Sequence, residues 1–89
     1  MKHIVKRHGK TESYDQRKLY AAVFSACQSL REPVGSSELI ADRVVADVNK
    51  WIDKKHEVTS NDIRATTAKY LKSYHADAAY IYLHHRVVW

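Results

Sequence analysis

From Gln16 almost to the end of the chain, apolar residues recur every three or four positions, a spacing that predicts amphipathic helices with one buried face. The single proline interrupts this pattern in the segment Arg31–Gly35, because proline cannot continue a helix and also restricts the residue before it. We therefore expect a first helix from Gln16 to about Leu30, with Asp15 as its N-cap.

Three more helices are expected after this break. The second runs from a cap at Ser36 or Ser37 to about Asp53, where a charged turn follows. His56–Thr59 has the pattern of a short strand, and Ser60 is expected to cap the third helix.

A fourth helix is expected to begin at Ala76 or Asp77, after a break at Ser73–His75. Each helix should bury one apolar stripe in a common core. The residues expected on these buried stripes are Leu19, Val23, Ala26, Cys27, Leu30, Ile40, Val44, Val48, Trp51, Ile52, Ile63, Thr67, Tyr70, Leu71, Tyr74, Ala79, Tyr80, Leu83 and Val87.

Two short extended stretches precede the first helix. The stretch that contains Ile4 and Val5 is joined to Lys10–Tyr14 by the two-residue link His8-Gly9, which predicts a β-hairpin. With the later strand, this gives an α+β fold of order ββααβαα that is dominated by helices. Eighty-nine residues make one domain, over residues 1–89.

Composition excludes several classes of protein. No apolar run approaches the ~20 residues that span a bilayer, and no signal peptide is evident, so we expect a cytoplasmic protein that does not bind membranes. Cys27 is the only cysteine, which excludes an internal disulfide. No phosphate-binding glycine loop or catalytic triad order is present, so we expect no enzymatic activity. The adjacent His84 and His85 point ~100° apart on a helix, so we expect no metal site.

Positive charge gathers where an anion could bind. The formal net charge is +5, and Lys6, Arg7 and Lys10 lie close together in the hairpin. Lys18 lies in the first turn of the first helix, where a cation opposes the helix dipole, and an anionic ligand would relieve that conflict. Taken alone, Lys18 is also compatible with an ordinary solvated surface lysine.

The start of the third helix is a second candidate anion site. Ser60 as N-cap leaves backbone amides available, and Arg64 lies one turn further on the same face. This arrangement can hold a phosphate or the edge of a ribose. As a lone signal it is weak, because the same residues are more often simply a helix start.

Together these residues resemble the ATP-cone family. The resemblance rests on the run Val5-Lys6-Arg7-His8-Gly9-Lys10-x-Glu12-x-Tyr14-Asp15-x-x-Lys18-Leu19, on Val58-Thr59-Ser60-x-x-Ile63 and on Ala79-Tyr80-Ile81, and extends from about His3 to Arg86. It implies a regulatory module that binds ATP or dATP, such as those in ribonucleotide reductases and in the repressor of their genes. The resemblance also implies that the N-terminal hairpin, with the short third strand, covers a four-helix unit and that the nucleotide lies beneath the hairpin. Mg²⁺ can accompany the triphosphate. His8 replaces the usual Asp of the turn, and Arg64 stands where some members have His.

The resemblance also implies a role for each matching residue. Val5 would pack on the base, Lys6 and Arg7 would reach the phosphates, and Lys18 would contact phosphate. Glu12 and Asp15 would make polar contacts to the base or sugar. The full set of nucleotide-binding residues expected on this basis is Val5, Lys6, Arg7, Glu12, Asp15, Lys18, Ser60 and Arg64.

Two questions about partners follow. The main alternative function is a small basic helical module that binds nucleic acid as a transcriptional regulator. Because no helix gathers Lys and Arg beside Asn or Gln for base readout, nucleic acid is not expected as a partner of this chain on its own. The fourth helix carries apolar residues outside its buried stripe, at Ile81, Tyr82, Val88 and Trp89, so we expect it to mediate self-association or docking to another domain.

Overall fold

The computed structural model describes residues 3–5 and 11–84, of which residues 3–5 and 11–13 are described as backbone only. The expected turn at His8-Gly9 and the expected stripe residue Val87 lie outside the described residues. The elements are, in chain order, β1 (His3–Val5), β2 (Thr11–Ser13), α1 (Gln16–Ser29), α2 (Val34–Asp53), β3 (Val58–Thr59), α3 (Ser60–Tyr74) and α4 (Ala76–His84).

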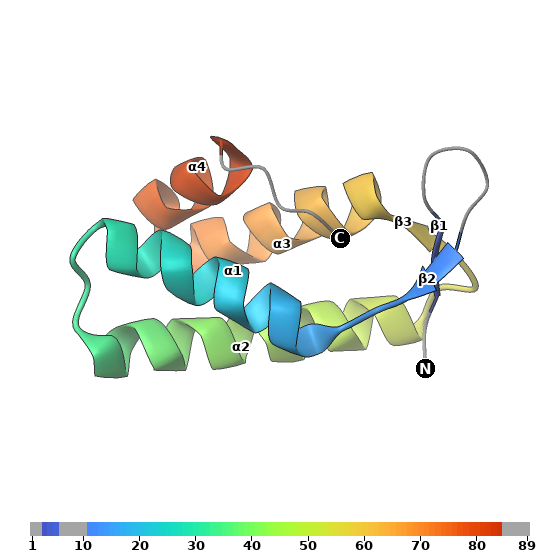
Figure 1. Cartoon of the computed structure of the whole chain (residues 1–89), viewed down its shortest axis with the longest axis horizontal. Helices are drawn as coiled ribbons and strands as arrows, with labels where there is room; N and C mark the ends of the chain where they lie inside the picture. The colour runs from blue at the N-terminus through green and yellow to red at the C-terminus, as the bar shows by residue number, and fades with distance from the viewer. Residues whose placement is uncertain (1–2, 6–10, 85–89) are drawn as a thin grey trace.

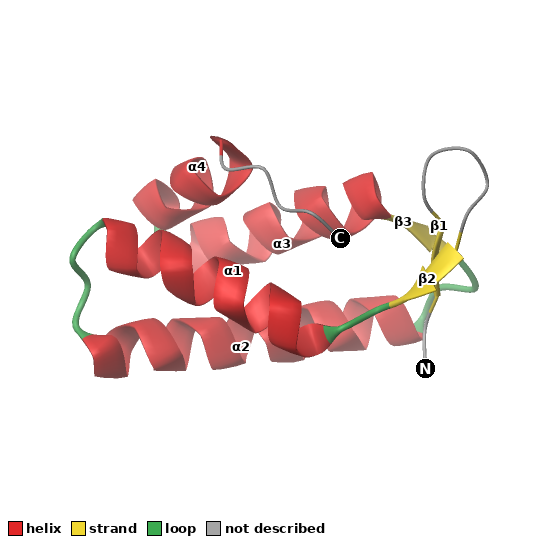
Figure 2. Ribbon diagram, viewed as in Figure 1, coloured by secondary structure: helices red, strands yellow, loops and turns green. Residues whose placement is uncertain are grey.

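The molecule is nearly all helical, and the expectation of an α+β fold whose strands cover a four-helix unit is wrong. Its helices have 14, 20, 15 and 9 residues, whereas its described strands have three, three and two. The strands gather at one end of the helices and do not lie over them (Figure 2). Strands this short have no face large enough to bury the bundle. Among residues with described side chains, Val58 is the only buried hydrophobic residue that a strand supplies.

The described strands form a small mixed sheet of order β2-β1-β3. β1 pairs antiparallel with β2 and parallel with β3. Val5 lies opposite both Thr11 and Thr59, and Ile4 lies opposite both Glu12 and Val58. The sheet therefore joins the segment that leads into α1 to the segment that leads into α3.

The four helices pack around one hydrophobic core. α1 contacts α2 and α4, and α3 contacts α2 and α4 (Figure 1). Several stripe residues expected from the sequence are confirmed as buried, including Leu19, Val23, Val44, Ile63 and Leu71. Complete burial of one such side chain contributes roughly 1.5–3 kcal/mol. Cys27 is also buried, and this burial raises the pKa of its thiol.

Asp15 is confirmed as the N-cap of α1, where its Oδ1 accepts a hydrogen bond from the Arg17 amide at 2.9 Å. The cap expected for α2 is wrong. This helix begins at Val34 after Pro33, whose fixed φ suits the entry to a helix. Ser37 is buried inside the helix, where its hydroxyl accepts a hydrogen bond from Gln28 Nε2 at 2.9 Å.

The start of α3 is capped by Thr59 and not by Ser60. The Thr59 hydroxyl accepts from the Asp62 amide at 3.0 Å, and the Asp62 carboxylate accepts from the Thr59 amide at 3.2 Å. This reciprocal pair is a capping box, which pairs two of the backbone donors at the helix start. Ser60 is thus the first residue of the helix, and its hydroxyl is not used as the cap.

The face that α4 buries differs from the expected one. Tyr82 is 1% exposed and packs in the core with Ala78 and Ala79, whereas Tyr80 is 63% exposed and Leu83 is 42% exposed. The two alanines allow α4 to approach its neighbours closely, and this brings the Tyr82 ring inside. No helix in the described part of the chain is both long and apolar enough to cross a membrane.

Candidate functional site

Several of the nucleotide-binding residues expected from the sequence lie at the strand end of the molecule. Val5 in β1 lies beside Thr59, the cap of α3, and Glu12 lies in β2, which leads into α1. Both α1 and α3 therefore begin at this end (Figure 1). Lys6 and Arg7 lie outside the described residues.

The first turn of α1 is electropositive. It contains no acidic residue, and Arg17 and Lys18 are exposed there. The partial positive charge of the helix N-terminus adds to these two cations, and such helix starts bind anions. Lys18 is therefore placed where an anionic group would be attracted.

Asp15 borders this turn as an ionised carboxylate. The Arg17 amide that donates to it is the main cause that keeps its pKa below the usual value, and the Arg17 side chain, 3.6 Å away, contributes further. A carboxylate repels phosphate. An anion bound at the start of α1 would thus lie towards Lys18, and Asp15 suits hydrogen-bond donors such as an amino group or a sugar hydroxyl.

Ser60 is the first residue of α3 and is half-buried, and Arg64 lies about one turn further along the helix. The Arg64 guanidinium donates a hydrogen bond to the carbonyl of Leu83 in the last turn of α4. A cation at a helix C-terminus stabilises that end of the helix. Arg64 thus ties α3 to α4 beside the candidate site, a contact that the sequence did not predict.

Three buried hydroxyl groups next to these residues were missed by the sequence reasoning. They belong to Tyr14, Thr67 and Tyr82, and within the described structure none of their oxygens has a hydrogen-bond partner. Burial raises the pKa of Tyr14 well above its usual value, and the nearby Tyr82 and Asp15 raise it further. The only warning in the sequence was Thr67, a polar residue on the buried stripe of the third helix.

The same neighbourhood includes Arg64. Burial raises the pKa of Tyr82, while the Thr67 hydroxyl and the Arg64 guanidinium act in the opposite direction. The interactions of Tyr82 with Thr67 and Arg64, and of Tyr14 with Tyr82 and Asp15, place all five residues in one region. This region lies between the start of α1, the first half of α3 and the end of α4.

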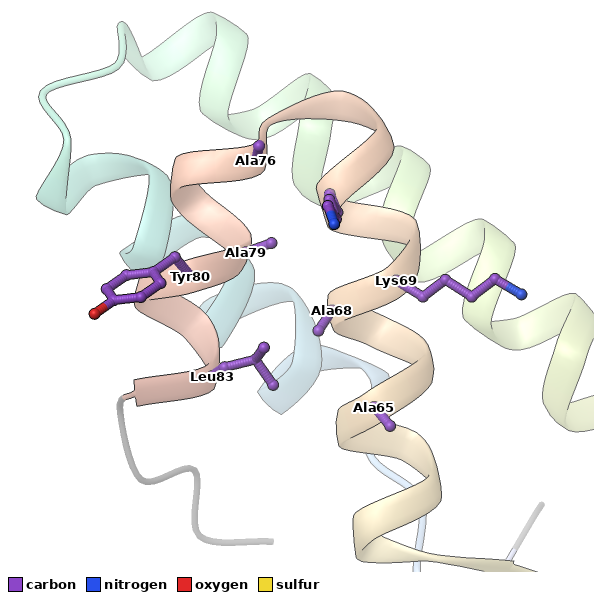
Figure 3. Close-up of a pocket in the computed structure, with 8 residues that line it drawn as sticks. Ala65, Ala68, Lys69, Ala76, Ala79, Tyr80 and Leu83 are labelled. Carbon is purple, nitrogen blue, oxygen red and sulfur yellow. The ribbon is translucent and has the colours of Figure 1, made fainter.

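A separate groove lies between α3 and α4 (Figure 3). Its volume is about 460 Å³, and it is mainly apolar, with two lysines among its lining residues. The lining residues are Ala65, Ala68, Lys69, Lys72, Ala76, Ala79, Tyr80 and Leu83. The exposed Tyr80 ring stacks on His84, with centroids 4.0 Å apart. The exposed apolar surface of α4 is therefore formed by Tyr80 and Leu83, and not by Tyr82 as the sequence suggested.

No group of three or more His, Cys, Asp or Glu side chains that could hold a metal ion occurs in the part of the chain that the structure describes. The strand end instead combines exposed cations, two helix starts, hydroxyl groups and the two carboxylates of Glu12 and Asp15. This combination suits an anionic organic ligand with several hydrogen-bonding groups.

Comparison with known proteins also indicates a nucleotide-binding domain. The family model of the ATP cone domain matches residues 2–89. The transcriptional repressor NrdR of Microcystis aeruginosa is 31% identical over 78 residues, which are 88% of this chain and 44% of the relative. The chain thus spans less than half the length of that curated relative. No solved structure matches the present chain.

Proposed function

Because the chain belongs to the ATP-cone family of regulatory nucleotide-binding domains, we propose that it binds ATP or dATP at its strand end and regulates a larger protein or assembly. The observation that carries this proposal is the start of α1. Its first turn has two exposed cations and no acidic residue, and it lies at the same end as the start of α3. A nucleotide triphosphate is an anion that both helix starts attract.

The charges of the surrounding residues determine the orientation that we propose for the nucleotide. Lys18, with Lys6 and Arg7, binds the phosphates, and Mg²⁺ accompanies the triphosphate. Asp15 and Glu12 bind donors on the base or sugar, and Val5 packs on the base. Ser60 and Arg64 approach from α3. The ionised state of Asp15 supports this division, because a carboxylate is repelled by phosphate but accepts hydrogen bonds from amino and hydroxyl groups.

The regulated process is proposed from the relative, which is named as a transcriptional repressor. Given this name, the expectation that nucleic acid is not a partner has no support. We propose that the chain acts as the nucleotide-sensing part of a transcriptional regulator, has no catalytic activity and works in the cytoplasm. The net charge of +5 is compatible with a nearby polyanion.

Signal transmission is proposed to pass through the exposed side of α4. Tyr80 and Leu83 are apolar, exposed and next to the groove between α3 and α4. Arg64 connects the start of α3 to the last turn of α4 through the Leu83 carbonyl. A nucleotide that contacts Arg64 would therefore alter the end of α4 directly, and with it the surface offered to a second copy or another domain.

Calorimetry with a matched pair of lysine variants tests the proposed site. Lys18→Ala should weaken ATP binding about tenfold, because a hydrogen bond assisted by charge contributes roughly 1.5–3 kcal/mol and Lys18 is exposed. Lys72→Ala is the control, since Lys72 lies in the last turn of α3, away from the strands (Figure 1). If both variants bind ATP as the wild type does, the start of α1 is not the phosphate site.

A further inference from the structure

The groove between α3 and α4 has the geometry of a surface that packs against another helix. Its lining residues on α3 are Ala65, Ala68, Lys69 and Lys72, and those on α4 are Ala76, Ala79, Tyr80 and Leu83. In both helices these positions follow the spacing i, i+3, i+4 and i+7, which is the stripe that one helix presents to a neighbour. Each stripe is about two turns long. Together the two stripes can hold a third helix between them.

The described part of the chain leaves this groove uncovered. Only residues of α3 and α4 line it there. The contacts of α3 with α2 and of α4 with α1 use other faces, on which Ile63, Leu71 and Tyr82 are buried. The side chains of Tyr80 and Leu83 are exposed to 63% and 42%. The groove is therefore an apolar surface open to a partner.

Positive charge borders one edge of the groove. Ala79 and Leu83 point towards α3, whereas Lys69 extends from the outer side of α3 and the Tyr80 ring lies on the outer side of α4 (Figure 3). Lys69 and Lys72 are exposed and lie about one turn apart. No lining residue is acidic, and neither lysine has an ion-pair partner among the described residues. The groove thus combines an apolar floor with two available cations on its α3 edge.

We infer that this groove binds an acidic amphipathic helix of a partner protein. The apolar side chains of that helix enter the groove beside Ala68, Ala79 and Leu83, as in other complexes in which a helix lies in an apolar groove. Carboxylates one turn apart along its edge pair with Lys69 and Lys72, and these pairs fix its orientation. The inference names the partner for the exposed side of α4, and in that respect it rests on the proposed function.

A second copy of this chain fits the groove less well than an acidic helix does. The chain has a net charge of +5, so two copies repel each other. On α2, the exposed Leu39 lies beside Glu38 and Asp42, but the exposed Arg43 follows one turn after the same leucine. This arginine would bring a like charge to the lysines of the groove. A helix with carboxylates alone along its edge avoids that repulsion.

The test uses a designed peptide of about 15 residues as the probe, because shorter isolated helices are marginal in water. The peptide carries leucines at the spacing i, i+4, i+7 and i+11 and glutamates along one edge, and a control peptide has lysines in place of the glutamates. Fluorescence anisotropy of the labelled peptides is measured with the wild-type chain and without nucleotide. The acidic peptide should bind saturably, and about tenfold or more tightly than the basic one.

A matched pair of charge reversals locates the contact. The double variant Lys69→Glu and Lys72→Glu should weaken binding of the acidic peptide about tenfold and strengthen binding of the basic peptide. The double variant Lys50→Glu and Lys54→Glu makes the same change in net charge at exposed residues near the end of α2. It should weaken binding of the acidic peptide by less than about twofold, because only the overall field changes.

A matched pair of leucine variants tests the apolar floor. Leu83→Ala should weaken binding of the acidic peptide about fivefold, because it removes apolar surface that the peptide would cover. Leu39→Ala removes an exposed leucine of α2 and should leave the binding unchanged. Thermal unfolding of all variants without peptide checks that each one is folded.

The inference is overturned if the acidic peptide does not bind at millimolar concentration, binds no more tightly than the basic peptide, or is weakened equally by the groove and control variants. Sedimentation velocity of the chain alone provides a further test. Self-association that Leu83→Ala abolishes would assign the groove to a second copy and overturn the inference. A failure of nucleotide binding is distinguishable from these outcomes, because the peptide titrations contain no nucleotide and the ATP titrations contain no peptide.

Discussion

Replacing Thr59 by alanine removes the N-cap of α3 but leaves every residue of the proposed nucleotide site in place. The substitution removes the hydroxyl that accepts from the Asp62 amide at 3.0 Å and leaves the capping box with only its other half. Loss of a Thr or Ser cap typically costs about 1 kcal/mol. In a domain of this size, that cost lowers the melting temperature by about 4–8 °C.

Ser60→Ala is the matched control for this prediction. Ser60 is the adjacent residue and an equally good cap by type, but the structure gives the capping role to Thr59. Thermal unfolding should therefore show a change for Ser60→Ala that is well below that of Thr59→Ala. Calorimetry should show the reverse order for ATP affinity, because Ser60 belongs to the proposed nucleotide site. A larger loss of stability for Ser60→Ala than for Thr59→Ala would refute the assignment of the cap.

Two other predictions concern the core and the acid range. Leu71→Ala should lower the free energy of unfolding by roughly 2–5 kcal/mol in a urea titration, since Leu71 is fully buried, whereas Leu39→Ala, at a residue that is 53% exposed, should change it by less than about 0.5 kcal/mol. Equal effects would contradict the core described above. Because the pKa of Asp15 is lower in the folded chain, its ionised form stabilises the fold above its unfolded value of 3.8, and this contribution is lost as the pH falls through the folded pKa. The stability difference between the wild type and Asp15→Asn should thus shrink on acidification, and a difference that does not change with pH would contradict this.

The helices could be predicted largely from the sequence because their signals are local. Pro33 marks the gap between α1 and α2, and Asp15 caps α1 as its type and position suggest. The position of the small sheet relative to the helices could not be predicted in the same way. Its central strand pairs residues 4 and 5 with residues 58 and 59, and the pattern of a two-residue strand does not show whether it covers the helices or sits at their end.

The wrong predictions for α4 and for the candidate site arise where the sequence pattern allows more than one arrangement. Apolar and aromatic residues occupy several faces of α4, so helical spacing alone could not show that Tyr82 is buried and Tyr80 is exposed. The hydroxyl groups of Tyr14, Thr67 and Tyr82 could not be grouped from the sequence, because these residues lie far apart in the chain. The cap of α3 was misplaced by one residue because Thr59 and Ser60 are both suitable caps.

The most direct measurement for the account as a whole is a calorimetric titration of the wild-type chain with ATP, dATP, ADP and GTP. We predict saturable binding of ATP or dATP, weaker binding of ADP because it has one phosphate fewer for the cations at the start of α1, and weaker binding of GTP. The absence of both heat and thermal stabilisation with every adenine nucleotide at millimolar concentration would contradict the proposal that this ATP-cone domain binds an adenine nucleotide.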